Sequence, residues 1–174
     1  MSIKTIFLDR DGVINQEINY LHQISDFKFV SGTFDACRDF QKKGYHIVIV
    51  TNQSGIERGI YTENDYQILT QWMLEQFIRN KIKILDVLHC PHGPESKCEC
   101  RKPKPGLLIK AKNLHNIDMH NSWMIGDKES DIQAAKNSDV GKTILVRSGH
   151  SINELKTDAK YIVDSIKQSK GLIN

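Results

Sequence analysis

Short apolar segments rich in β-branched residues alternate along this chain with segments of helical periodicity, and few folds accommodate that order. Strands that alternate with helices form βαβ units, so we expect an α/β fold: a doubly wound, mostly parallel sheet in three layers, with helices on both faces. Gly44 is placed to end the first helix, and Thr62 with Asp65 has the spacing of a helix start. The expected strands are Ile3–Leu8, His46–Thr51, Ile84–Cys90, Ser122–Ile125, Lys142–Val146 and Tyr161–Val163. The expected helices are about Phe34–Lys43, Glu63–Asn80, Pro105–Leu114 and Ser130–Asn137.

The length and composition are those of one ordinary domain without an export signal. The 174 residues contain no repeat or linker, so we expect a single domain over residues 1–174. No apolar run approaches the roughly 18 residues of a membrane helix. Asp9, Arg10 and Asp11 interrupt the first apolar stretch almost at once. We therefore expect a cytoplasmic protein with no membrane partner.

The charge pattern points to a small anion and away from nucleic acid. A net charge of +3 is too small to indicate nucleic-acid binding, and the aromatic residues Trp72 and Phe77 have the helical spacing of a core. Between Arg101 and Lys112 there are five cations and no acid, which favours an anionic substrate, although Lys110 and Lys112 also fit a solvated helix face. No G-x-G-x-x-G motif follows the first strand, which excludes a dinucleotide site of that type.

Polar and acidic residues follow several of the expected strands. Asp9-Arg10-Asp11-Gly12 closes the first strand, Thr51-Asn52 closes the second, and Gly126-Asp127 follows the fourth. In open α/β sheets, ligands bind beyond the carboxyl ends of the strands. These segments are therefore expected to meet in one site.

The carboxylates in these segments predict a magnesium site. Asp9 and Asp11 are two residues apart, so both can face one small volume, and such a pair is costly unless a cation lies between them. Asp127 and Asp131 add carboxylates one helical turn apart. Oxygen ligands of this kind suit Mg²⁺. The alternative is that Asp11-Gly12 is only a turn and Asp127 only a helix cap. Either explanation would be preferred if its segment stood alone, but the magnesium site explains both segments together.

Cysteines and histidines gather in a second segment. Cys90, Cys98 and Cys100 lie within eleven residues, and either His89 or His92 can add an imidazole. A Cys₃His set suits tetrahedral zinc, and four protein ligands leave no open position, so this zinc would be structural. The alternative is a group of unbound surface thiols. Cys37 stands apart in a helical pattern and is expected to be a buried apolar residue.

Taken together, four motifs resemble the haloacid dehalogenase (HAD) superfamily of phosphohydrolases. They are Phe7-Leu8-Asp9-Arg10-Asp11-Gly12-Val13, Thr51-Asn52-Gln53-Ser54-Gly55, Arg101-Lys102-Pro103, and Gly126-Asp127 with Asp131. The resemblance covers almost the whole chain and implies a Rossmann-like core.

The resemblance also implies a role for each motif residue. Asp9 would attack phosphorus and form an aspartyl-phosphate, and Asp11 would serve as the general acid and then the general base. Thr51 and the Asn52 amide N–H would hold phosphoryl oxygens, while Arg101 and Lys102 would supply positive charge. The Mg²⁺ ligands would be Asp9, the backbone carbonyl of Asp11, and Asp127, with Asp131 orienting them.

The zinc loop, at about residues 90–100, resembles one branch of the superfamily, whose members carry almost no cap domain. In that branch the zinc ligands would be Cys90, His92, Cys98 and Cys100, which favours His92 over His89. The branch includes enzymes for heptose bisphosphates and for histidinol phosphate. Its substrate-binding residues would be Glu17, Asn19, Tyr20, Asn52, Gln53, Ser54, Arg58 and Lys128.

The resemblance to this branch implies that the substrate is D-glycero-D-manno-heptose 1,7-bisphosphate, which would lose its 7-phosphate in the synthesis of activated heptose for lipopolysaccharide or another surface glycan. The segment from Thr51 to Gly59 matches the heptose enzymes better, and a second phosphate needs cations such as Arg58, Arg101 and Lys128 at the mouth. One alternative is a histidinol-phosphate phosphatase. An alternative of another class is a sensor that binds a phosphorylated sugar without turnover, although it would not need Asp9 and Asp11 together. We expect a monomer whose partner is its small sugar substrate.

Overall fold

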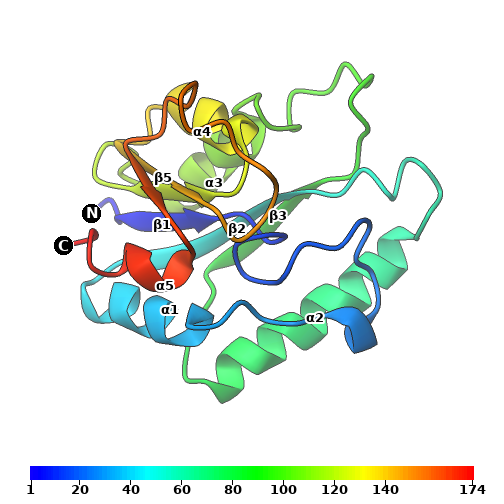
Figure 1. The fold of residues 1–174 in the computed structure, drawn as a ribbon, viewed down its shortest axis with the longest axis horizontal. Coiled ribbons are helices and arrows are strands. Elements are labelled where there is room, and N and C mark those ends of the chain that lie inside the picture. The colour runs from blue at the N-terminus through cyan, green and yellow to red at the C-terminus, as the bar shows by residue number, and fades with distance from the viewer.

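Six strands form one parallel sheet in the computed structural model, which describes all residues 1–174 (Figure 1). The spatial order is β3-β2-β1-β4-β5-β6, and every neighbouring pair is parallel, as the sequence predicts. Two strands are two residues shorter than expected at their starts, because Ile3 makes only an isolated bridge to Ile117 and Leu85 precedes the regular ladder. The strands are β1 (Thr5–Leu8), β2 (His46–Asn52), β3 (Asp86–Cys90), β4 (Trp123–Gly126), β5 (Lys142–Val146) and β6 (Tyr161–Val163).

Helices cover both faces of the sheet and complete the predicted three layers. Figure 1 shows α3 and α4 on one face, and α1, α2 and α5 on the other. The helices are α1 (Thr33–Lys42), α2 (Glu63–Arg79), α3 (Gly106–His115), α4 (Glu129–Lys136) and α5 (Ile166–Ser169), with a 3-10 turn η1 (Ile24–Asp26). The sequence did not predict α5 or η1, which are too short to show a helical period.

The predicted helix boundaries at Gly44 and Thr62 are confirmed. Gly44 follows α1 with a φ of +82°, a left-handed conformation that favours glycine and ends the helix. Thr62 caps α2: its hydroxyl accepts from the Asp65 N–H, and the Asp65 carboxylate accepts from the Thr62 N–H.

Alternate residues of the strands fill two apolar cores, one on each face. Ile6 and Ile47 belong to the core beneath α1 and α2, whereas Phe7 and Val48 belong to the core beneath α3 and α4. A sheet covered on both faces explains why its strands read as continuous apolar runs. Cys37 is fully buried in the first core, as predicted, and burial raises the pKa of its thiol to about 12.

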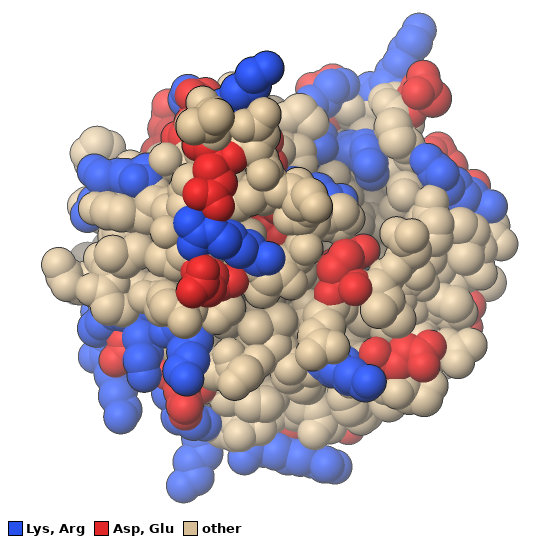
Figure 2. Space-filling view, in the orientation of Figure 1, with Lys and Arg blue, Asp and Glu red and all other residues tan.

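No domain is inserted between the strands and helices that frame the carboxyl edge of the sheet. Residues 13–32 and 53–62 are loops, apart from η1, which agrees with the minimal cap expected. None of the helices combines the length and apolarity needed to cross a bilayer. Figure 2 shows acidic and basic side chains interspersed on the face in view, with a hollow near the carboxyl ends of the strands.

Candidate active site

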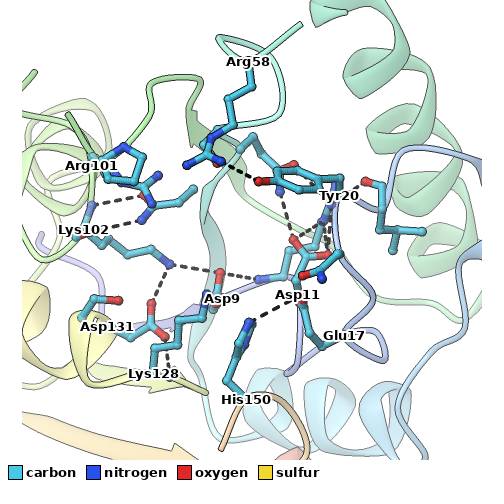
Figure 3. A pocket seen from close by; sticks show the side chains of 18 of the residues that line it. Asp9, Asp11, Glu17, Tyr20, Arg58, Arg101, Lys102, Lys128, Asp131 and His150 are labelled. Carbon is cyan, nitrogen blue, oxygen red and sulfur yellow. Dashed lines mark hydrogen bonds and ion pairs between the residues drawn. The ribbon is translucent and has the colours of Figure 1, made fainter. Parts of the chain in front are cut away.

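The order of the sheet reverses between β1 and β4, and the candidate site lies beyond the carboxyl ends of these two strands. Open α/β sheets bind ligands at such a switch point. Here the strands end at a cavity of about 580 Å³, shown in Figure 3. Asp9 comes directly after β1 and Asp127 directly after β4, so the fold brings these two predicted residues together.

Lys102 joins two of the carboxylates into one buried cluster. Its Nζ lies 3.0 Å from Asp9 Oδ1 and 2.6 Å from Asp131 Oδ1 (Figure 3), and it also donates to the Val50 carbonyl oxygen at 2.8 Å. Burial acts to lower the pKa of Lys102, but the carboxylates of Asp131 and Asp9 outweigh it, and the net shift is upward. Lys102 is therefore a fixed positive charge beside Asp9.

The carboxylate of Asp9 is held on one side only. Its Oδ1 accepts from the Arg10 backbone N–H at 2.9 Å and from Lys102, while no protein donor binds Oδ2. Burial raises the pKa of Asp9 well above its usual range, the carboxylates of Asp131 and Asp127 raise it further, and Lys102 opposes them. Because Asp9 lines the cavity, its second oxygen is available to a ligand there.

Asp131 holds the start of α4 and Lys102 at once. Its Oδ2 accepts from the backbone N–H groups of Asp127 and Lys128, both at 3.1 Å, and its Oδ1 accepts from Lys102. Both oxygens are therefore engaged by the protein. The role of Asp131 in orienting the Mg²⁺ ligands stays a prediction.

Asp127 is fully buried, and its two oxygens differ sharply. The backbone N–H of His150 lies 2.9 Å from Oδ2, and His150 Nδ1 lies 2.6 Å from the same atom. Oδ1 is buried and has no hydrogen-bond partner in the protein. A buried carboxylate oxygen without a donor calls for an explanation, and a bound cation supplies one.

The donor set at this edge fits Mg²⁺. Side-chain oxygens of Asp9, Asp127 and Asp131 lie within 4.8 Å of one another. Two like charges at that separation repel by about 3 kcal/mol at the effective dielectric constant of about 20 usual for proteins, and Lys102 offsets only part of this. Hard oxygen donors are the ligands that Mg²⁺ prefers. Asp9 and Asp127 would hold the ion, while the share of the Asp11 backbone carbonyl stays a prediction.

Asp11 lies at the cavity wall among hydrogen-bond donors. Arg10 Nη2 lies 3.0 Å from Asp11 Oδ1, Asn15 Nδ2 donates to the same oxygen at 3.0 Å, and Gln53 Nε2 donates to Oδ2 at 3.0 Å. Tyr61 in turn donates to Gln53 Oε1 at 2.5 Å. This network fixes the Asp11 carboxylate, and Arg10, which is almost completely buried, is a part of the site that the sequence did not single out.

Thr51 and Asn52 are placed differently from each other. Thr51 is fully buried and is absent from the cavity lining, and its hydroxyl accepts from Gln53 Nε2 at 2.8 Å. Asn52 lines the cavity, and its side chain clamps the backbone of Lys102: Oδ1 accepts from the Lys102 N–H at 3.1 Å, and Nδ2 donates to the Lys102 oxygen at 3.2 Å. Phosphoryl binding by Thr51 and by the Asn52 N–H stays a prediction.

The four predicted zinc ligands converge. His92 Nδ1 lies 3.6 Å from Cys90 Sγ and 3.4 Å from Cys100 Sγ, and Cys90 Sγ lies 3.7 Å from Cys98 Sγ. Atoms bonded to one tetrahedral zinc at about 2.3 Å lie roughly 3.8 Å apart, so these three distances fit such an ion. The pair Cys90–Cys100, at 2.7 Å, is closer. His89 instead contacts Glu63 at 3.0 Å, outside the cluster.

The loop that carries this Cys/His cluster also contacts Arg101, at the cavity rim, and Glu57. Arg101 Nη1 donates to the His92 carbonyl oxygen at 3.0 Å. The Glu57 carboxylate accepts from the Gly93 N–H, and the Glu57 N–H donates to the Pro91 oxygen at 3.2 Å. The Cys/His loop therefore holds the Arg101 side chain through the His92 carbonyl, and it holds Glu57 through backbone groups of Pro91 and Gly93.

The cavity rim is built from polar residues of several loops. Arg58 Nη1 donates to the Tyr20 hydroxyl at 2.9 Å (Figure 3), and Tyr20 adopts a φ of +57°, uncommon for a residue other than glycine. Burial raises the pKa of Glu17 to about 7. The predicted substrate-binding residues that line the cavity are Glu17, Asn19, Tyr20, Asn52, Gln53, Ser54, Arg58 and Lys128.

Sequence reasoning missed His150, which both lines the cavity and contacts Asp127. A signal was available, because His150 follows β5, and the rule that the site lies beyond strand ends applies to β5 as well. For Glu57, no periodic signal exists, because its partners are the backbone groups of another loop.

The fold and site define a class of protein. A six-stranded parallel sheet carries Asp9 after its first strand, Lys102 beside it, and Asp127 after β4. The model of the HAD-hydrolase-like family matches residues 99–169, which include Lys102 and Asp127.

Curated relatives extend the match to the whole chain. The D-glycero-alpha-D-manno-heptose-1,7-bisphosphate 7-phosphatase of Campylobacter jejuni is 46% identical over 174 residues, covering 100% of this chain and 96% of that protein. The D-glycero-beta-D-manno-heptose-1,7-bisphosphate 7-phosphatase of Vibrio cholerae is 45% identical, covering 96% and 94%. The chain belongs to the family of the D-glycero-D-manno-heptose-1,7-bisphosphate 7-phosphatases, within the HAD-like hydrolases.

The fold is also that of a solved structure. The D,D-heptose 1,7-bisphosphate phosphatase from B. bronchiseptica, complexed with magnesium and phosphate, superposes with a TM-score of 0.86 at 24% identity, covering 98% of this chain and 97% of that one. This confirms the predicted fold.

Proposed function

We propose that this protein is a phosphatase that removes the 7-phosphate of D-glycero-D-manno-heptose 1,7-bisphosphate through an aspartyl-phosphate intermediate. The observation that carries the proposal is the buried pairing of Asp9 with Lys102 at the switch point, in a member of a family of heptose bisphosphate phosphatases. Asp9 keeps one carboxylate oxygen free of protein donors, and Lys102 keeps the other oriented.

In the first step, Asp9 Oδ2 attacks phosphorus while the bond from phosphorus to the sugar oxygen breaks. Asp11 donates a proton to that leaving oxygen. In the second step, Asp11 takes a proton from water as the water oxygen attacks phosphorus, and the bond to Asp9 breaks to release inorganic phosphate. Lys102 stabilises negative charge on Asp9 and on the transferred group.

Mg²⁺, bound by Asp9 and Asp127, would neutralise charge on the phosphoryl oxygens. Zn²⁺ in the Cys/His cluster would have no part in the chemistry, because four protein ligands close its coordination. Its contribution would be to place the loop from Cys98 to Lys102, since Arg101 is held by the His92 carbonyl.

The cavity rim favours a bisphosphate over histidinol phosphate. Arg58, Arg101 and Lys128 provide cations for a second phosphate, whereas Glu17 is the one carboxylate among the lining residues outside the catalytic group. The cationic amine of histidinol phosphate would therefore have few anionic partners in the cavity. We further propose a monomer that works in the cytoplasm and supplies heptose phosphate for lipopolysaccharide or another surface glycan, on the strength of family membership.

Phosphate release with Mg²⁺ tests the substrate. The panel is both anomers of the heptose bisphosphate, histidinol phosphate and an aryl phosphate. We expect kcat/KM to be highest for one or both heptose anomers, because the named relatives differ in the anomer that they cleave. A preference for histidinol phosphate would overturn the substrate and leave the chemistry standing. Tight sugar binding without phosphate release would favour the sensor.

A further inference from the structure

The turn after β5, residues 147–150, packs against Asp127. β5 lies beside β4, so its carboxyl end opens at the same edge of the sheet. Gly149 packs so closely that a Cβ there would lie 2.1 Å from Asp127 Oδ2. Ser148 Oγ donates to the Gly12 oxygen at 2.7 Å, which fastens this turn to the loop that follows Asp11. The turn therefore belongs to the site, although none of its residues belongs to the motifs described above.

His150 makes a two-point contact from this turn to a single oxygen. Its N–H and its Nδ1 both reach Asp127 Oδ2, at 2.9 and 2.6 Å. Because an ionised carboxylate can only accept, Nδ1 must carry the hydrogen in this contact. Two donors on Oδ2 fix the rotation of the carboxylate, and Oδ1, which is buried without a partner, is left facing away from them.

The other ring nitrogen of His150 faces the opposite wall of the cavity. Nε2 lies 3.7 Å from Glu17 Oε1, an ion-pair distance, as Figure 3 shows. Glu17 is part of the loop that also carries Asn19 and Tyr20 on the cavity rim. One imidazole thus lies between the carboxylate of Asp127 and the loop at the cavity mouth.

We propose that His150 is a positioning residue: it holds Asp127 so that Oδ1 is presented to the divalent cation, and it ties the Glu17 loop to that carboxylate. The cation's role in turnover rests on the proposed function, but the placement of Asp127 does not. We assign His150 no contact with the reacting atoms.

Two substitutions separate the two ring nitrogens. In His150→Asn, the side-chain amide nitrogen can occupy the position of Nδ1. This variant keeps the hydrogen bond to Asp127 and loses the contact with Glu17. In His150→Gln, the longer side chain brings the amide near the position of Nε2, which gives up the bond from Nδ1. His150→Ala removes both contacts, and His120→Ala, at an exposed histidine, is the matched control.

The primary readout is Mn²⁺ binding to the free protein, followed by electron paramagnetic resonance, with the zinc cluster intact. Residues that orient metal ligands typically contribute 10- to 100-fold in affinity. We expect His150→Ala to weaken Mn²⁺ binding by about tenfold or more, His150→Gln to weaken it similarly, and His150→Asn to restore it to within about threefold of wild type. His120→Ala should not change it.

Kinetics give the second readout. His150→Asn should raise KM for the bisphosphate with kcat nearly unchanged, because the Glu17 contact alone is lost. Unchanged Mn²⁺ affinity in His150→Ala, with a wild-type circular dichroism spectrum, would overturn the proposal. Rescue by Gln but not by Asn would also overturn it. If His150→Ala does not fold, the comparison of Asn with Gln decides alone. Weakened Mn²⁺ binding in a protein that cleaves no sugar phosphate would refute the proposed substrate and leave this inference intact.

Discussion

The molecule has two clusters of side chains that could hold a metal ion, and they are built in opposite ways. Three carboxylates, Asp9 after β1 and Asp127 and Asp131 after β4, come from segments far apart in the sequence and are almost completely buried. The Cys/His cluster takes all four donors from eleven residues, beginning at the end of β3, and is only partly buried.

The difference lies in what each cluster leaves open. In the carboxylate cluster, Asp131 is fully engaged by the protein, while Asp127 Oδ1 and Asp9 Oδ2 are without protein donors. In the Cys/His cluster, the four donor atoms converge, and four protein ligands would leave no open position on a bound zinc ion. The first arrangement suits an ion that shares its coordination with a substrate, and the second suits an ion that holds a loop.

Removing the carboxylate that would react should have the largest effect. Asp9→Asn keeps the size of the side chain and removes the nucleophile, so phosphate release should fall by at least about 1,000-fold. Asp26→Asn, at an exposed aspartate, should change nothing. Steady-state phosphate release with circular dichroism checks both variants. Retained turnover in Asp9→Asn would refute the covalent mechanism.

Removing the ammonium should damage chemistry and stability together. Lys102→Met leaves Asp9 and Asp131 buried without their partner, and breaking such a pair costs about 3–5 kcal/mol. Turnover should fall by about 100- to 1,000-fold, the cost of losing one group that stabilises developing charge. Urea unfolding gives the free energy, and kinetics at saturating Mg²⁺ give kcat. An unaltered urea midpoint would show that the carboxylates do not depend on Lys102.

The Cys/His cluster should affect turnover only through placement. Cys98→Ser should lower zinc content and thermal stability, and it should reduce kcat/KM by about tenfold, in the range seen when supporting metal-site residues are lost. The reason is that Arg101 loses its fixed partner at His92. Cys37→Ala, at a buried cysteine outside the cluster, should lower stability and leave zinc and kinetics unchanged. Unchanged kinetics in a folded, zinc-free protein would separate the loop from the site.

The smallest expected effect concerns pH at the rim. Burial raises the pKa of Glu17 to about 7 in the folded protein, above its ordinary value. The contribution of Glu17 to folding stability is therefore fully present below that ordinary value and is lost as pH rises through 7. The same ionisation repels phosphate, so KM should rise between pH 6 and 8, by about threefold on the scale of partly exposed charge pairs. Glu17→Gln should remove this dependence. Both proteins are measured at each pH, because the substrate phosphate also titrates near 6.

The fold could be read from the sequence because its signals are periodic and repeated. Six apolar segments, each closed by a turn or a polar residue, gave six strands, and Gly44 and Thr62 marked helix boundaries that the structure confirms. The four-residue α5 shows no period, so its position depends on packing of Ile166 in the core.

The site was predictable where a motif follows a strand, and less so where loops meet. Asp9 and Asp127 come together because parallel strands end at one edge, whereas Lys102 lies in the loop between β3 and α3. The burial of Thr51 beneath Gln53, and the clamp of Asn52 on the Lys102 backbone, depend on side-chain directions at the end of β2 that residue type does not specify. The contact of Glu57 with Gly93 depends on two irregular loops.

The pairing of β1 with β4 has a consequence for synthesis. Lys102, the counter-charge of Asp9, lies 93 positions after it in the sequence, and Asp127 lies later still. Asp9 is therefore synthesised well before the residues that surround it in the folded site. The cluster of Asp9, Lys102 and Asp127 can form only after β4 has been synthesised and has paired with β1.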